Sequence, residues 1–172
     1  MRIGSVSATV SAVAALDGDP ELNPLNGDAR PFSDWLTTFP MLVGAIDPYT
    51  HESSWLLDTM QRIFHHYRGA GVRNVWLATA PVEGATQFLG PYAEEFLSFA
   101  DPDYTATKAL GLSTLPALAL VKQDGTIAAS AEGWDPAAWR EVAQAVSDIT
   151  GWTPLAIPGP KDPAPYAGTA VN

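Results

Sequence analysis

The chain of 172 residues contains no cysteine. Without a thiol it can form no disulfide and has no thiolate to act as a nucleophile. Iron–sulfur ligation and zinc sites built on cysteine are excluded for the same reason. Disulfide reduction and thiol peroxidase activity are therefore ruled out for this chain.

Positive charge is also scarce. Nine Lys and Arg residues stand against 19 Asp and Glu residues, which gives a formal net charge of −10. Such a chain has too little positive charge to neutralise phosphates, so we expect neither a nucleic acid partner nor an anionic membrane surface. The sequence also lacks a run of 18 apolar residues, so it predicts no transmembrane helix. The partners that stay open are a protein or an extended peptide, and a homo-oligomer.

The first residues resemble a secretory signal only weakly, and whether they are one stays open. Met1–Leu16 has one early positive charge and small apolar residues, but serines and a threonine interrupt its apolar part. We interpret it as a strand or short helix that packs on the core. Cytoplasmic residence is the expectation, and a secreted or periplasmic location stays open because a chain without cysteine suits any compartment.

Apolar residues make up 47% of the chain, which is enough for a packed core. The length fits one domain with extensions. We predict an N-terminal extension over residues 1–40 that packs on the core and an α/β domain over residues 41–151. Residues 152–172 form a proline-rich tail, which has the composition of neither a helix nor a central strand. Whether this tail is docked or disordered stays open.

The first half of the domain predicts a strand, a helix and a strand. Met41–Ile46 is a continuous apolar run, typical of a buried central strand. A helix is expected from Ser53 or Ser54 to about Arg68, and Arg73–Thr79 is the next strand. This order implies a parallel pair with a right-handed crossover. The helix has an apolar face that consists of Trp55, Leu56, Met60, Ile63, Phe64 and Tyr67.

Other stretches have weaker patterns. Asp17–Pro31 is rich in Asp, Asn, Gly and Pro and is expected to be loop. Phe32–Phe39 is expected to hold a short helix capped by Ser33. Pro81–Glu95 is expected to be irregular with one helical turn, and Phe96–Phe99 to be a short edge strand.

The second half predicts a helix, a proline-led hairpin and a final helix. Pro116 stands at the first residue of a strand, where a missing backbone N–H is tolerated. From the local residues alone, a cis and a trans peptide bond before Pro116 are equally open. The order is helix Tyr104–Leu110, the tripeptide Thr114-Leu115-Pro116, strand Ala117–Val121, an Asp-Gly turn, strand Ile127–Ala131, and helix Pro136–Thr150 capped by Asp135.

The two halves together resemble the thioredoxin-like superfamily, which includes thioredoxins, TlpA-like proteins and peroxiredoxins. The resemblance covers Met41–Thr150 and rests on the element order and on Pro116, which matches the proline that opens a sheet strand in cis in that family. It implies an α/β fold: a three-layer α/β/α sandwich with a mixed central sheet. This chain would be a cysteine-free, redox-inactive member.

The resemblance also implies where a site would lie. In the family the active dithiol follows the first core strand, and the matching tetrapeptide here is Thr50-His51-Glu52-Ser53, with Thr50 and Ser53 in place of the two cysteines. The backbone before the cis proline pairs with an extended substrate segment in that family. The implied binding groove consists of Tyr49, Thr114, Leu115 and Pro116.

Catalysis without a thiol would need an activated hydroxyl in this loop. Thr50 or Ser53 with His51 and Glu52 has the residue types of an activated hydroxyl, but neighbours in one loop point in different directions, whereas a triad needs convergence in space. Helix capping by Thr50, Ser53 or Ser54 is the favoured interpretation. The three histidines, His51, His65 and His66, do not show a chelating spacing, so we expect no metal, no cofactor and no catalytic residue.

The resulting expectation is a non-catalytic binding or structural protein that uses the groove beside Pro116. The alternatives are a non-thiol enzyme that uses Thr50, His51, Glu52 or Ser53, and a degenerate homologue retained as a subunit of an assembly. Exposed apolar area near Tyr49 would favour binding. A hydroxyl within hydrogen-bond reach of His51 would favour catalysis.

Overall fold

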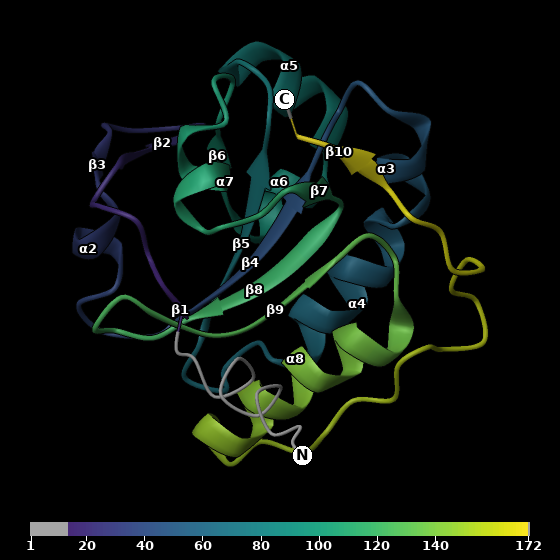
Figure 1. The fold of residues 1–172 in the computed structure, drawn as a ribbon. Coiled ribbons are helices and arrows are strands. Elements are labelled where there is room, and N and C mark those ends of the chain that lie inside the picture. The colour runs from purple at the N-terminus through teal and green to yellow at the C-terminus, as the bar shows by residue number, and fades with distance from the viewer. Residues whose placement is uncertain (1–13, 172) are drawn as a thin grey trace, which may run out of the picture.

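A mixed sheet of eight strands lies at the centre of the computed structural model, which describes residues 14–171 (Figure 1). The strands are β1 (Ala14–Ala15), β2 (Glu21–Pro24), β3 (Arg30–Pro31), β4 (Met41–Ile46), β5 (Arg73–Ala78), β6 (Leu97–Ala100), β8 (Ala117–Val121) and β9 (Thr126–Glu132). Their order across the sheet is β1-β9-β8-β4-β5-β6-β2-β3. A separate pair joins β7 (Thr114–Leu115) to β10 (Thr169–Ala170).

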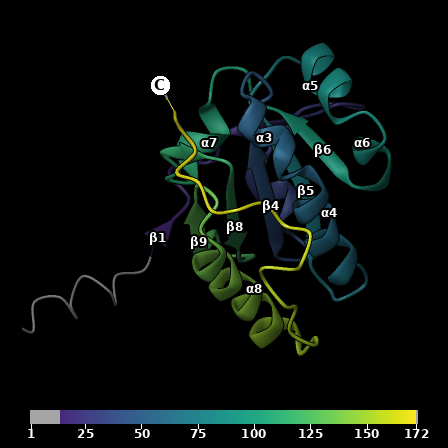
Figure 2. The ribbon, with the colours of Figure 1, turned by 90° about the vertical axis from the view of Figure 1, so that its right-hand side faces the viewer.

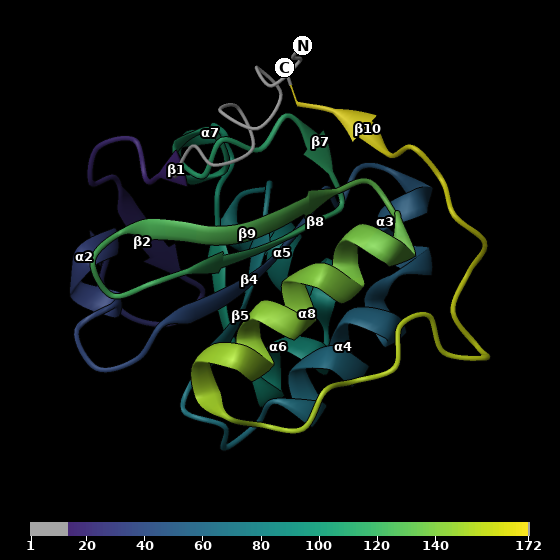
Figure 3. The same ribbon diagram turned by 60° about the horizontal axis from the view of Figure 1, so that its bottom comes forward.

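Helices cover both faces of the sheet, and Figure 3 shows α4 and α8 next to each other on one of them. The helices are α2 (Phe32–Trp35), α3 (His51–Trp55), α4 (Leu57–His66), α5 (Val82–Leu89), α6 (Tyr92–Glu95), α7 (Thr105–Ala109) and α8 (Pro136–Thr150). Two apolar clusters, one on each face, hold these layers together.

β4 is the strand on which both clusters depend. It pairs in parallel with β5 and antiparallel with β8, and all six of its residues are buried, as its continuous apolar run predicts. Successive side chains of a strand point to opposite faces. Leu42 and Ile46 therefore join the cluster under α4 and α8, while Met41 and Val43 join the cluster under α2 and α7.

The helix after β4 differs from the expected one. It begins at His51 rather than at Ser53 or Ser54, and it divides at Leu56 into α3 and α4. The Leu56 backbone N–H donates to the Ser53 carbonyl at 3.2 Å, a tighter turn than that of an α-helix. This turn rotates Trp55 away from the apolar face, and Trp55 is 57% exposed where a buried side chain was expected.

The segment before β4 is more ordered than its composition predicts. Asp17–Pro31 contains β2 and β3 rather than loop alone, because Leu22 and Pro24 alternate with exposed residues and face the core. β2 pairs with β6, so β6 is not an edge strand. The short helix α2 is present, but Ser33 does not cap it. The Ser33 backbone N–H and hydroxyl donate instead to the carboxylate of Asp19, at 2.9 and 2.6 Å.

Pro81–Glu95 is helical where irregular chain was expected. α5 starts after Pro81 and buries Ala85 and Leu89, four residues apart on one face, and α6 follows Gly90. Gly84 and Gly90 weaken the helical signal in the sequence. Of the segment Met1–Leu16, residues 1–13 lie outside the described range, and Ala14–Ala15 pairs with β9 as β1.

α8 follows its sequence signals closely. Asp135 caps it by accepting a hydrogen bond from the Ala138 N–H, and Gly151 ends it with φ 76°. Trp134, before the cap, packs edge-to-face on Trp139 at a centroid distance of 5.2 Å. This pair is the hydrophobic staple that fixes how the chain enters the helix. None of the helices within residues 14–171 combines the length and apolar character needed to span a membrane.

The C-terminal segment, residues 152–171, is docked along the helices (Figure 2). Its residues contact progressively earlier turns of α4 and α3: Trp152 Nε1 donates to the His66 carbonyl at 2.7 Å, and Arg62 Nη1 donates to the Ala156 carbonyl at 3.0 Å. The segment therefore runs antiparallel to these helices and ends beside β7.

Candidate functional site

The loop after β4 is fastened by its own hydroxyl groups. Ser53 is completely buried, and its Oγ accepts from the Asp47 backbone N–H at 3.0 Å. Thr50 Oγ1 donates to the Asp47 carbonyl at 3.1 Å and lies 3.2 Å from Ser53 Oγ. Thr50 is the N-cap residue of α3, but its side chain does not accept a capping hydrogen bond. Both hydroxyls therefore take part in hydrogen bonds that hold the loop in shape.

His51 does not join this arrangement. Within residues 14–171 its ring forms no side-chain hydrogen bond with Thr50 or Ser53, whose partners lie in the loop itself. Ser54 Oγ donates to the His51 carbonyl at 2.6 Å, which is a local turn contact. The pairing of a base with a hydroxyl that would favour catalysis is not assembled in this structure.

The other two histidines are engaged elsewhere. His65 Nε2 lies 3.0 Å from a carboxylate oxygen of Glu95, and His66 Nε2 lies 2.6 Å from the Thr153 carbonyl. Over residues 14–171, His, Asp and Glu side chains do not gather in a group of three or more that could hold a metal ion.

β7 is held rigidly on its other side. One oxygen of the Glu132 carboxylate accepts from the Ser113 N–H, the Ser113 hydroxyl and the Thr114 N–H at 2.7 to 2.8 Å. The Leu115–Pro116 peptide bond is cis, and Leu115 is 2% exposed. The Pro116 carbonyl accepts from the Gly133 N–H at 2.8 Å. The backbone edge of β7 is thus preformed next to the start of α8.

An extended segment already occupies this edge, and it comes from the same chain. Thr169 pairs antiparallel with Leu115, and Ala170 with Thr114. The Val171 N–H donates to the Ser113 carbonyl at 2.8 Å. We call this place the β7 slot; its walls are Glu52 of α3, Ser113–Leu115 and Gly133–Trp134. The predicted groove residues Thr114 and Leu115 lie in it, paired with a strand that the sequence analysis did not foresee.

Tyr166 joins the two walls of the β7 slot. Its backbone exchanges two hydrogen bonds with Trp134, at 2.9 and 3.1 Å. Its hydroxyl donates to the Glu52 carbonyl at 2.5 Å, and its ring packs edge-to-face on Trp55 at 5.7 Å. Burial raises the pKa of the Tyr166 phenol, and the nearby Glu52 carboxylate raises that pKa further. The side chain is therefore held neutral as a hydrogen-bond donor.

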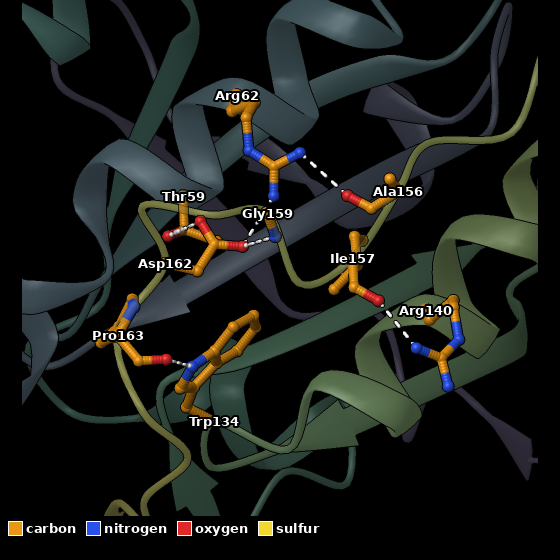
Figure 4. A network of polar contacts seen from close by, with 9 residues as sticks. All are labelled: Thr59, Arg62, Trp134, Arg140, Ala156, Ile157, Gly159, Asp162 and Pro163. Carbon is orange, nitrogen blue, oxygen red and sulfur yellow. Dashed lines mark hydrogen bonds and ion pairs between the residues drawn. The ribbon is translucent and has the colours of Figure 1, made fainter.

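A polar network secures the segment before it reaches the slot (Figure 4). Asp162 Oδ1 accepts from Thr59 Oγ1 at 2.7 Å, and Asp162 Oδ2 accepts from Arg62 Nη2 at 2.7 Å and from the Gly159 N–H at 2.6 Å. The side chain of Asp162 is 4% exposed. Trp134 Nε1 donates to the Pro163 carbonyl at 2.7 Å, so the network extends to the slot.

Two aromatic side chains in and before α3 are exposed. Tyr49 is 71% exposed and Trp55 is 57% exposed. Tyr49 also lines a shallow hollow of about 260 Å³ between the loop after β4 and α5, together with Pro48, Gly84, Gln87 and Phe88. Exposed aromatic side chains of this kind are typical of surfaces that bind proteins.

Comparison with known structures identifies the fold. A hypothetical protein from Sinorhizobium meliloti 1021 superimposes with a TM-score of 0.66 and 15% identity, over 92% of this chain and 93% of its own. The thioredoxin domain of a thiol-disulfide oxidoreductase from Bacteroides vulgatus gives a TM-score of 0.62 and 12% identity, over 81% and 98%. The fold is thioredoxin-like. A putative thiol:disulfide interchange protein DsbE from Chlorobium tepidum gives a TM-score of 0.64 and 19% identity over 78% of this chain and 97% of its own.

At these identities the likeness establishes the fold and not the activity. No family model and no curated protein matches the chain. The thioredoxin-like α/β architecture expected from the element order is confirmed. The chain combines this fold with the complete lack of cysteine. That Thr50 and Ser53 stand where two cysteines would fall stays a prediction.

Proposed function

We propose that this chain is a non-catalytic binding protein that holds an extended segment of a partner protein in the β7 slot. The observation that carries the proposal is the antiparallel pairing of β10 with β7. A strand edge offers backbone groups to any extended chain, and side-chain pockets next to it add selectivity. In this structure the C-terminal segment takes the place of the partner.

The chemistry of the slot agrees with binding rather than catalysis. The chain has no thiol, and the Thr50 and Ser53 hydroxyls are used within their own loop. The exposed ring of Trp55, which contacts Tyr166, adds apolar area next to the slot.

The C-terminal segment would compete with a partner. A tethered segment has an effective concentration on the order of 1 mM. If a free peptide binds the slot with a Kd of about 100 µM, the tethered segment reduces its apparent affinity about tenfold. Partner binding would therefore strengthen when the segment leaves the slot.

The test uses the full chain with Gly168→Val, which removes the segment from the slot. A Cβ at Gly168 would lie 2.5 Å from the Leu115 carbonyl oxygen, and φ at this position is +85°. A labelled peptide with the sequence of residues 163–171 is titrated by fluorescence anisotropy. We expect it to bind the Gly168→Val chain at least tenfold more tightly than the wild-type chain. Ala170→Val is the matched control, because Ala170 is exposed, and it should behave like the wild type.

Two methylated peptides test whether the backbone pairs with β7. N-methylation at Val171 removes the N–H that donates to Ser113 and should weaken binding at least tenfold. Neighbouring N–H groups of a strand point in opposite directions, so N-methylation at Ala170 should change the affinity less than threefold. Equal binding of both peptides, or no binding to a folded Gly168→Val chain, would refute the proposed function.

A further inference from the structure

We propose that the β7 slot selects an extended segment with the pattern Tyr-x-Gly-x-x-Val, in which the last residue is aliphatic. This inference rests on the proposed function and names its ligand class. The template is the segment from Tyr166 to Val171, whose three specified residues each have a different contact: Tyr166 with Glu52, Gly168 with the β7 backbone, and Val171 with an apolar cluster.

The glycine is required because two backbones approach each other closely. Besides its overlap with Leu115, a Cβ at Gly168 would lie 3.0 Å from Thr114 Cγ2 and 3.2 Å from the Gly133 Cα. On the facing wall, a Cβ at Gly133 would lie 3.0 Å from the Ala167 carbonyl carbon. Both glycines have positive φ, a conformation that other residues adopt only with strain. A ligand with any side chain at the position of Gly168 must therefore move away from β7.

The tyrosine is selected by a hydrogen bond and a ring contact together. The Tyr166 hydroxyl reaches the Glu52 carbonyl, while the ring packs on Trp55. Glu52 and Trp55, both in α3, thus recognise the hydroxyl and the ring of one side chain. A phenylalanine at this position would keep the ring contact with Trp55 but would have no hydroxyl to donate to the Glu52 carbonyl. A small side chain would lose both contacts.

The aliphatic residue is selected where the segment leaves the slot. Val171 packs against the apolar cluster on the α7 face of the sheet, the same cluster that contains Leu115. Of the three residues between the specified positions, Ala167 and Ala170 are exposed, and Thr169 is half-buried. The exposed positions should accept most side chains.

A peptide panel on the full Gly168→Val chain tests the pattern. The reference peptide has the sequence of residues 163–171, and each variant changes one position. We expect Gly168→Ala to weaken binding at least tenfold, Tyr166→Phe about threefold to tenfold, and Val171→Ser at least threefold. The controls Ala167→Ser and Ala170→Ser should stay within twofold of the reference.

The outcomes separate the two proposals. If the reference peptide binds and all variants bind equally well, the slot accepts extended chains without this selection, and the inference is overturned while the proposed function stands. If the reference peptide does not bind at all, the proposed function itself fails. Hydrogen exchange of the β4 and β8 amides in the receptor chain verifies that its core is folded, so that a negative result counts.

Discussion

Asp162 should control whether the C-terminal segment stays docked. Replacing it with alanine removes three hydrogen bonds at once, to Thr59, Arg62 and the Gly159 N–H. The substitution leaves the sheet and the helices that pack on it untouched, because Asp162 lies outside both apolar clusters. We therefore expect Asp162→Ala to release the segment without unfolding the domain.

The loss of docking free energy in Asp162→Ala depends on how deeply the hydrogen-bond partners of Asp162 are buried. A hydrogen bond to a charged group contributes about 1.5–3 kcal/mol. The three bonds of Asp162 contribute less than their sum, because Arg62 is 35% exposed and regains water when the carboxylate is removed. We estimate a loss of about 2–4 kcal/mol in the docking free energy of the segment. This loss lowers the equilibrium constant for docking by about 30-fold to 1,000-fold, so that most molecules become undocked.

Native-state hydrogen exchange measures this change directly. The N–H groups of Tyr166 and Val171 are hydrogen-bonded only while the segment is docked, so in Asp162→Ala their protection should fall nearly to that of an undocked chain. The amides of β4 and β8 should keep their protection. Asp148→Ala is the control, because this exposed carboxylate accepts only from Gln144. Unchanged protection of Tyr166 and Val171, or an equal loss in β4, would contradict the assigned role of Asp162.

Two further predictions concern the core and the phenol in the slot. Gly44→Ala should lower the free energy of unfolding by about 1–3 kcal/mol in chemical denaturation, because the new Cβ would overlap Met60 Sδ and lie 2.9 Å from Phe64 Cζ. A stability equal to the wild type would show that Met60 moves aside at no cost. Because the pKa of Tyr166 is raised in the docked state, docking is complete below the ordinary tyrosine pKa near 10 and is lost as the pH rises through the raised value. A dye on a single cysteine introduced by Asn172→Cys should lose anisotropy above pH 10, and Tyr166→Phe should remove this pH dependence.

The central part of the fold was predictable because its signals are local and agree with one another. The apolar run of β4 and the Asp135–Pro136 start of α8 give those elements their bounds in the sequence. Pro116, next to the first residue of β8, marks where that strand begins. Each signal needs only a few neighbouring residues, and the resulting elements fit one arrangement of layers.

The missed features depend on partners far away in the sequence. β2 is stable because β6, more than 70 residues later, supplies its hydrogen bonds. In the sequence, Trp55 falls on the apolar face of the predicted helix. In the structure, the tight turn at Leu56 rotates it away from that face. Its ring then meets Tyr166, a residue that the periodicity of α3 does not reveal. Patterns of 2.0 and 3.6 residues describe a face of an element, but they do not say what covers that face.

The proline-rich segment shows why composition alone misleads here. Prolines exclude a helix and a central strand, yet they do not prevent docking through carbonyl groups. The segment offers the carbonyls of Ala156, Ile157 and Pro163 to Arg62, Arg140 and Trp134. Proline also lowers the entropy that an extended segment loses when it docks. After its last proline, Pro165, the segment uses its backbone N–H groups to pair with Trp134 and β7. A segment whose prolines exclude a helix thus ends in a short strand that pairs with β7 beside Pro116.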